Sequence, residues 1–311
     1  MSEKKSPVDV YAVVNNRIIK QLEKGIVPWQ HPWGEAGLPK NLITGKPYKG
    51  INLWLLNPLG YKQNYFLSSK QIKELGATIK EGQKGNVTVF WKWLEIKDDE
   101  TDQIANIPFL RYGNVYNIEQ CEGIPEAYIP MLNEKEVNPL QKCLEIIVQM
   151  PKQPKIKNKE GKSFYNPLLD VVSIPRGETF RNKESYYSKL FIELVHSTGH
   201  LSRVNRKEVI QQKAFGCEPY SIEELIAEIG AGYLKSFAGM SEEYFETNEE
   251  DLKGWLEKIR NDRRFIVYAS TLAQKATDFI LNLGYKPNET VPSTETKLEE
   301  IQEGGEDDLP F

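Results

Sequence analysis

Apolar residues in the first part of the chain recur with periods that predict one long helix and several strands. Residues 8–24 have apolar positions at helical spacing, and Gly25 marks the end of this predicted helix. Residues 65–67 and 87–96 are rich in aromatic and β-branched side chains and predict strands, with 109–116 as the partner of the second strand. The pattern therefore predicts a small α+β unit.

The second half of the chain is predicted to be mostly helical, with two short strands. The predicted helices cover residues 141–150, 180–195 and, with breaks at Gly239 and Gly254, 228–283; the predicted strands cover 164–166 and 171–174. The lysine-rich segment 152–162 is predicted to be a turn or loop, either simply solvated or extending a nucleic-acid surface.

These patterns predict an α+β protein with two domains. The first domain covers residues 1–125, and the proline-containing segment 126–140 is the predicted linker. The second domain covers residues 141–285. Residues 286–311 are polar and acidic with few large apolar side chains, so this tail is predicted to be disordered.

Composition indicates a globular chain without a membrane anchor. The sequence has no run of 18 or more apolar residues, and its first residues lack the apolar segment of a secretory leader. The three cysteines, Cys121, Cys143 and Cys217, are far apart and suggest no disulfide framework. We therefore expect a cytoplasmic location.

The net charge of −4 conceals an uneven distribution along the chain. Residues 1–97 contain 15 Lys and Arg against 7 Asp and Glu, whereas the remainder has a net charge of −12. A basic first part is typical of proteins that bind nucleic acids, although a basic surface can also serve only solubility.

Aromatic and basic residues alternate in the same part of the chain. This is the composition of surfaces that stack unpaired bases and neutralise phosphates. The alternative is that the tryptophans belong to the core, which we expect for Trp54, whereas Trp29 and Trp33 lie among prolines and polar residues and are expected to be exposed. The candidate DNA-binding residues are Trp29, Trp33, Lys46, Tyr48, Lys49, Asn52, Lys70, Lys73, Lys80 and Lys84.

A candidate metal site lies in the sequence FIELVHSTGH. His196 and His200 are four residues apart in an apolar run, and such a pair projects from one face of a helix. This holds only if the helix continues through Gly199; the alternative is that Thr198-Gly199 ends it. Glu193 precedes His196 by three residues, where a zinc hydrolase has its general base. The usual H-E-x-x-H motif is incomplete, because Ile192 occupies the position of its first histidine.

Further ligands for such a site must come from another segment. Glu224 and Glu228 are four residues apart on a second predicted helix and are the candidates. The alternative is that His196 caps or packs a core helix and that both glutamates are solvated.

The order of motifs resembles a known family. The chain contains, in sequence, KGIVPW, TGKPYKGIN, SSKQIKELGATIKEGQKG and VYNIEQCEGIP, which is similar to the N-terminal domain of ArdC-type antirestriction proteins. It then contains YYSKLFIELVHSTGHLSRVNR, YSIEELIAEIGAGYL and GWLEKIRNDRRFIVYASTLAQKATDFIL, which resemble the zincin-like metallopeptidase domain of these proteins. The resemblance implies single-stranded DNA binding by the first domain and a metallopeptidase fold in the second.

The resemblance also implies roles for individual residues. It assigns the catalytic glutamate to Glu193 and the metal ligands to His196, His200, Glu224 and Glu228. A catalytic zinc usually has three protein ligands and one open position, so Ile192 removes one of them. Three outcomes stay open: a rearranged metal site, a weak metal site, or a pseudoenzyme. Zinc is the candidate cofactor.

The last residues of the chain resemble the acidic tip of bacterial single-stranded-DNA-binding proteins. In such tips the terminal phenylalanine and its carboxylate enter a pocket of a partner, and the acidic residues meet basic ones. The corresponding residues are Asp307, Asp308, Leu309, Pro310 and Phe311. The alternatives are an ordinary acidic tail or a segment that covers the protein's own basic surface.

Together these features predict a single-stranded-DNA-binding antirestriction protein of a mobile element that protects or processes incoming DNA. One alternative is an active zinc peptidase acting on a host protein. Another is a non-catalytic adaptor that links single-stranded DNA to repair or replication proteins through its tail. The peptide substrate, the base preference and the oligomeric state are not encoded in any motif of the sequence.

Overall fold

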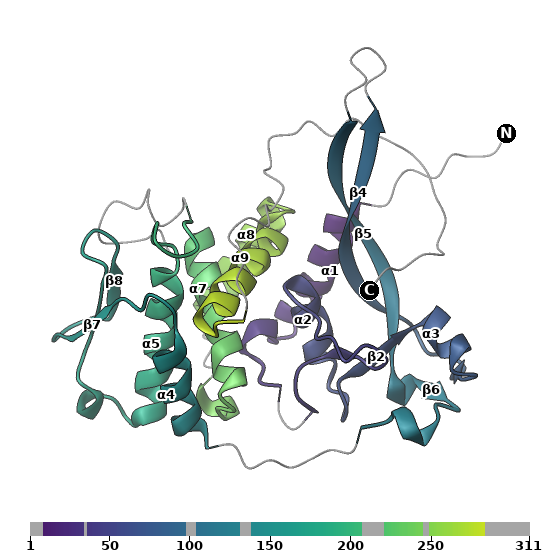
Figure 1. Ribbon diagram of the computed structural model, residues 1–311, viewed down its shortest axis with the longest axis horizontal. Coiled ribbons are helices and arrows are strands. Elements are labelled where there is room, and N and C mark those ends of the chain that lie inside the picture. The colour runs from purple at the N-terminus through teal and green to yellow at the C-terminus, as the bar shows by residue number, and fades with distance from the viewer. Residues whose placement is uncertain are drawn as a thin grey trace.

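The computed structural model describes residues 9–33, 36–97, 104–130, 138–206, 221–244 and 249–283. Its helices are α1 (Val10–Leu22), α2 (Ile51–Leu56), α3 (Ser69–Glu74), α4 (Pro139–Gln149), α5 (Lys183–Ser197), α7 (Ile222–Phe237), α8 (Glu249–Asn261) and α9 (Phe265–Ile280). Its strands are β1 (Lys40–Asn41), β2 (Tyr65–Ser68), β3 (Thr78–Ile79), β4 (Asn86–Lys97), β5 (Ile104–Asn117), β6 (Cys121–Glu122), β7 (Lys155–Asn158), β8 (Phe164–Asn166) and β9 (Val171–Ile174) (Figure 1).

The first part of the chain forms a four-stranded sheet in the order β1-β2-β5-β4. The predicted pairing of the two long strands is confirmed, because β4 and β5 are antiparallel over their whole length with Trp91 opposite Leu110. Strand β2 pairs with β5 only near its end, from Val115 to Asn117. Most of β4 and β5 therefore forms a long two-stranded ribbon, which Figure 1 shows extending beyond the rest of the sheet.

Local sequence explains where the helices of this part begin and end. Asp9 caps α1 by accepting a hydrogen bond from the backbone N–H of Tyr11 at 3.0 Å, and Gly25 follows the helix with a φ of +78°. Ser68 and Gln71 form a capping box at the start of α3. The helix predicted over residues 8–24 is confirmed.

The second sheet differs from the prediction in one strand. Its order is β7-β9-β8, and β7 pairs in parallel with β9. The prediction of a turn or loop over residues 152–162 is therefore wrong for Lys155–Asn158. Only Ile156 in this strand packs against the core, so an edge strand with exposed lysines on either side looks like a solvated loop in the sequence.

The last helices also correct one prediction. The break at Gly239 is confirmed, since this residue follows α7 with a φ of +74°. The break predicted at Gly254 is wrong, because the residue lies inside α8. A helix interior tolerates glycine at a cost of about 1 kcal/mol, and the adjacent buried Trp255 and the buried Ile259 hold this helix in place.

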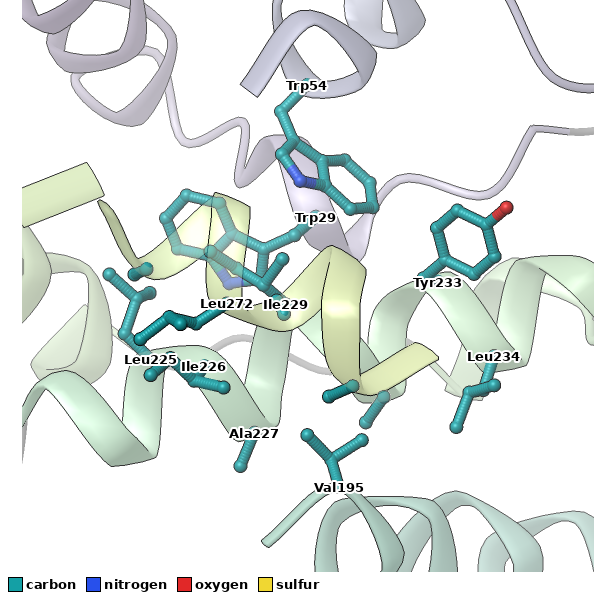
Figure 2. Close-up of a cluster of buried hydrophobic side chains, with 14 of the residues drawn as sticks. Trp29, Trp54, Val195, Leu225, Ile226, Ala227, Ile229, Tyr233, Leu234 and Leu272 are labelled. Atoms are coloured by element: carbon teal, nitrogen blue, oxygen red, sulfur yellow. The ribbon is translucent and has the colours of Figure 1, made fainter. Parts of the chain in front are cut away.

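One hydrophobic core continues through both halves of the chain. It contains buried residues of α1 and α2 together with those of α4, α5, α7, α8 and α9. Helix α1 packs on α8, and α2 packs on α9. Figure 2 shows Trp29 and Trp54 above the apolar side chains Ile226 and Ile229 of α7 and Leu272 of α9. Smaller apolar clusters lie under β2, α3 and β6.

The expected exposure of Trp29 and Trp33 is wrong. Trp29 has no exposed surface and Trp33 is 7% exposed. The short 3₁₀ turn Pro28–Gln30 places Trp29 against α7, and Trp33 makes an edge-to-face contact with Tyr233, with 4.9 Å between the ring centroids. Both rings fill the space between distant segments, which no local pattern of prolines reveals. Trp54 is buried as predicted.

Two further predictions concern a membrane anchor and the acidic tail. No helix among the described residues is long and apolar enough to cross a membrane. The acidic tail and its last five residues lie outside the described residues.

Gly232 should be essential for joining the two halves, because a Cβ atom there would overlap the carbonyl oxygen of Trp29. We expect Gly232→Ala to lower the free energy of unfolding by about 1–3 kcal/mol or more, since backbone atoms relax little. Urea denaturation measures this change. Gly177→Ala is the control, because its Cβ would meet only Tyr186 at 4.0 Å. Equal stability of the two variants would contradict the close contact.

Candidate functional site

The helix α5 carries the first predicted site residues. Asn182 caps its start, and Glu193 and His196 lie in its last two turns. The helix ends at Ser197, and His200 lies in the following turn, where its Nδ1 atom is 2.8 Å from the hydroxyl of Ser202. The prediction that His196 and His200 project from one helical face is therefore wrong, because the Thr198-Gly199 pair ends the helix between them.

Two neighbouring glutamates of α7 face His196 from opposite sides of its ring. The Nδ1 atom of His196 is 3.1 Å from Oε1 of Glu223, and its Nε2 atom is 3.8 Å from Oε2 of Glu224. The sequence predicted Glu224 but missed Glu223. The only available signal was the pair of acidic residues in the first turn of this helix, because nothing local shows which of the two turns inward.

A buried arginine holds Glu223 in this position. The Nε atom of Arg206 donates to Oε2 of Glu223 at 3.0 Å, and a second nitrogen bonds the other oxygen. The same guanidinium also binds the carbonyl of Val195 at 2.9 Å and the hydroxyl of Thr198. Both Arg206 and Glu223 are almost completely buried. Arg206 thereby joins the loop that follows α5 both to the end of α5 and to α7.

A second arginine anchors the start of the same loop. Arg203 is buried and donates to the carboxylate of Asp170, to the hydroxyl of Tyr165 at 3.2 Å and to the carbonyl of Ser197 at 2.8 Å. Asp170 lies in the turn between β8 and β9, with a φ of +50°. No motif in the sequence marked either arginine as part of the site.

Burial and charge shift the pKa values of the residues around His196. Burial alone would lower the pKa of His196, but the hydrogen bond and charge of Glu223 outweigh it and raise this pKa. Burial raises the pKa of Glu193 above its usual value. Burial also raises the pKa of Glu228 to about 7, with the charge of Asp251 adding to the effect.

Glu228 lies toward the first half of the chain. Its Oε2 atom is 3.5 Å from the indole nitrogen of Trp29, which is a weak hydrogen bond. Within the described residues there is no group of three or more His, Cys, Asp or Glu side chains that could bind a metal ion. The predicted set of four ligands is therefore not assembled there.

The side chains present do not fit a catalytic zinc centre. Two ligand atoms on one tetrahedral zinc ion are separated by roughly 3.4 Å, so the His196–Glu224 spacing of 3.8 Å could accommodate two donors. Among the described residues the third donor is missing, because position 192 is an isoleucine whose side chain packs against the core. The Nδ1 atom of His196 is instead bound by the carboxylate of Glu223. In metal sites, a carboxylate that does not itself bind the metal commonly holds a histidine ligand in this way.

The predicted DNA-binding residues fall into two groups. The exposed group consists of Lys46, Lys49, Lys70, Lys73, Lys80 and Lys84. Lys80 donates to the carbonyl of Glu119 at 2.9 Å, and Lys49 forms an ion pair with Asp278 of α9 at 3.0 Å.

The other predicted DNA-binding residues have structural partners. Asn52 donates to the carbonyl of Val89 at 2.6 Å and accepts from the N–H of the same residue at 2.7 Å, so its amide is occupied by β4. Tyr48 packs edge-on against Phe66, and burial raises its pKa to about 12. Trp29 and Trp33 are buried, as described above. Of the predicted surface, the lysines are exposed but the aromatic rings are not.

Comparison with known proteins gives a match for each half of the chain. Residues 8–116 match the model of the N-terminal domain of the anti-restriction factor ArdC, and residues 144–272 match a zincin-like metallopeptidase model. The crystal structure of the antirestriction ArdC protein from the R388 plasmid is similar over 88% of this chain and 97% of that chain, with 31% identity and a TM-score of 0.69. The chain belongs to the ArdC antirestriction family. The ArdC protein has also been solved with Mn(II) bound, with the same TM-score to this chain.

Other relatives of this ArdC-family chain include longer proteins. Two DNA primases TraC of Escherichia coli are 30% identical over 90% and 87% of the chain. The chain spans only 28% and 20% of their lengths. The protein y4eC of Sinorhizobium fredii is 27% identical, over 88% of this chain and 92% of its own length.

Removal of the buried arginine should be costly. Arg206→Ala leaves Glu223 buried without its ion-pair partner, so we expect a loss of about 3–5 kcal/mol in the free energy of unfolding. Chemical denaturation measures it. The control is Arg181→Ala, which breaks the exposed pair with Glu243 at 3.3 Å and should cost less than about 1 kcal/mol. Similar losses in both variants would contradict the role of Arg206.

Ile192→His should restore a metal site, because position 192 precedes His196 by one helical turn and would add the missing donor. We expect near-stoichiometric Zn²⁺ or Mn²⁺ binding by this variant, measured by calorimetry and elemental analysis, and much weaker binding by the original protein. Adding His196→Ala to the variant should abolish the gain. Tight binding by the original protein would show that donors outside the described residues complete its site.

Proposed function

We propose that this protein is a single-stranded-DNA-binding antirestriction protein of a mobile element that protects incoming DNA. Membership of the ArdC family supports an antirestriction role. The names of the relatives, an antirestriction protein from a plasmid and two DNA primases, support DNA as the partner. In this proposal residues 1–125 bind DNA in the cytoplasm, and residues 141–285, joined through 126–140, provide the zincin-like domain.

The observation that carries the proposal is the set of exposed lysines around the second apolar cluster. This cluster contains Leu42, Leu67 and Ile72, and the elements around it carry lysines that are exposed to solvent. These lysines are Lys46, Lys70, Lys73, Lys80 and Lys84. Basic side chains at the surface attract the phosphate backbone whatever the base sequence, which suits a protein that must coat foreign DNA.

The zincin-like half is proposed to act as a scaffold rather than a peptidase. Glu193 is buried beside His196, as a general base would be, but in a zincin the water that such a glutamate deprotonates is one made acidic by the metal. Because Ile192 occupies a ligand position, the described residues provide at most two metal donors here, Nε2 of His196 and Oε2 of Glu224. The peptidase alternative therefore needs a donor from residues that the structure does not describe.

The tail proposal is independent of these domains. Asp307, Asp308, Leu309, Pro310 and Phe311 lie outside the described residues, so docking onto host proteins rests on their sequence alone. The adaptor alternative depends on this tail in addition to single-stranded DNA binding by the lysine surface.

DNA binding can be tested by neutralising the surface lysines. The variant Lys70→Gln, Lys73→Gln, Lys80→Gln, Lys84→Gln should bind a single-stranded oligonucleotide more weakly in fluorescence anisotropy. The slope of log K against log salt concentration should become shallower by up to about 3, since each lost phosphate contact removes about 0.7.

The matched control removes the same charge from the second half of the chain. It replaces Lys155, Lys157, Lys159 and Lys162 with glutamine, which are exposed in or near β7. We expect it to bind like the original protein. An equal loss in both variants would show that binding is not located in the first half, and absence of binding by the original protein at low salt would reject the function.

A further inference from the structure

The long ribbon of β4 and β5 carries two exposed aromatic rings close together. Trp91 is 38% exposed and Tyr112 is 40% exposed. The pairing is regular, with Val89 opposite Tyr112 and Trp91 opposite Leu110. Because side chains two residues apart share a face of a strand, Trp91 and Tyr112 are diagonal neighbours on one face, about 7–8 Å apart.

Neither ring is used by the fold in the way that the buried tryptophans are. Among the described residues, Trp91 and Tyr112 make no side-chain hydrogen bond and no ring contact. Large aromatic side chains left exposed as neighbours usually mark a binding surface. The sequence predicted exposed aromatic side chains on the DNA-binding surface. Trp29 and Trp33 are buried, whereas Trp91 and Tyr112 are exposed.

The backbone under the two rings is held firmly. Val89 and Leu110 lie beside the two rings on the same face of the ribbon; Val89 is buried in the main core, and Leu110 packs against that core. The amide of Asn52 binds both the N–H and the C=O of Val89, which occupies the outer edge of β4 at this position. The rings therefore stand on a fixed base, which keeps the entropic cost of ordering them low when a ligand binds.

Lysines at the start of the ribbon have the charge that a nucleic acid requires of its binding partner. Lys80 and Lys84 are exposed just before β4 begins, and the first 97 residues have a net charge of +8. On the other face of the ribbon the guanidinium of Arg111 lies 5.1 Å from the ring centre of Phe109. Aromatic faces beside basic side chains stack unpaired bases and neutralise the phosphates between them.

We propose that Trp91 and Tyr112 form a stacking platform for the unpaired bases of single-stranded DNA, with Lys80 and Lys84 contacting the phosphates that lead to it. The proposal rests on the DNA-binding function proposed above and gives that function its aromatic contacts. The bases of a duplex are already stacked, so the platform favours single strands over double strands.

The test compares Trp91→Ala, Tyr112→Ala and the double variant with the original protein, using a fluorescent oligothymidine and a duplex of equal length. Each single variant should bind the single strand about tenfold more weakly. The slope of log K against log salt concentration should stay unchanged, because the rings have no charge. Trp91→Phe should recover most of the affinity, and Tyr128→Ala, which removes another exposed ring, should have no effect.

The outcomes separate this inference from the proposed function. If the original protein binds no single strand at low salt, both fail. If it binds and the double variant, with an unchanged melting temperature, binds equally well, only the stacking platform is rejected. A double variant that changes the oligomeric state and leaves DNA affinity intact would show that the rings contact a second copy of the chain, and would also overturn the inference.

Discussion

The contact between Trp29 and α7 is the constraint on which the rest of the structure depends. The carbonyl of Trp29 lies so close to Gly232 that no larger residue fits, and the indole nitrogen of Trp29 is 3.5 Å from Oε2 of Glu228 in the same helix. The opposite side of α7 packs on α5, and Gly230 meets Val195 there, where a Cβ would be 2.9 Å from the methyl groups. The same helix therefore joins the two halves of the chain and carries the glutamates that face His196.

The buried ion pair of Arg206 and Glu223 gives the zincin-like half its other fixed point. Burying two charges costs desolvation free energy, which this pair offsets with hydrogen bonds to the end of α5. The arrangement orients His196 although Ile192 cannot act as a ligand. A histidine held in this way, beside a buried Glu193, preserves the surroundings of a metal site, while the residues that the structure describes leave the site one donor short. The fold of this half accordingly has a source of order that does not require a metal.

On the surface proposed to bind DNA, the exposed aromatic residues are not the ones that the composition of the sequence favours. Prolines and polar residues around Trp29 and Trp33 suggested exposure, but both rings are buried where two halves of the chain meet. Trp91 lies in a strand rich in apolar residues and is nevertheless 38% exposed, because the ribbon extends past the helices that cover the start of β4. The lysines behaved as their sequence suggested, because a solvated ammonium group is costly to bury wherever the backbone places it.

The sequence by itself determined the family, the α+β class, the pairing of the two long strands and most helix boundaries, because periodicity, capping residues and glycines act over a few residues. It also predicted the helices on which Glu193, His196 and Glu224 lie. Only the tertiary structure decided that Glu223 and Arg206 hold His196, that His200 leaves the helix, and that Trp29 and Trp33 are buried. These features depend on contacts between residues far apart in the chain, and no local pattern specifies which side chains meet when helices and strands pack.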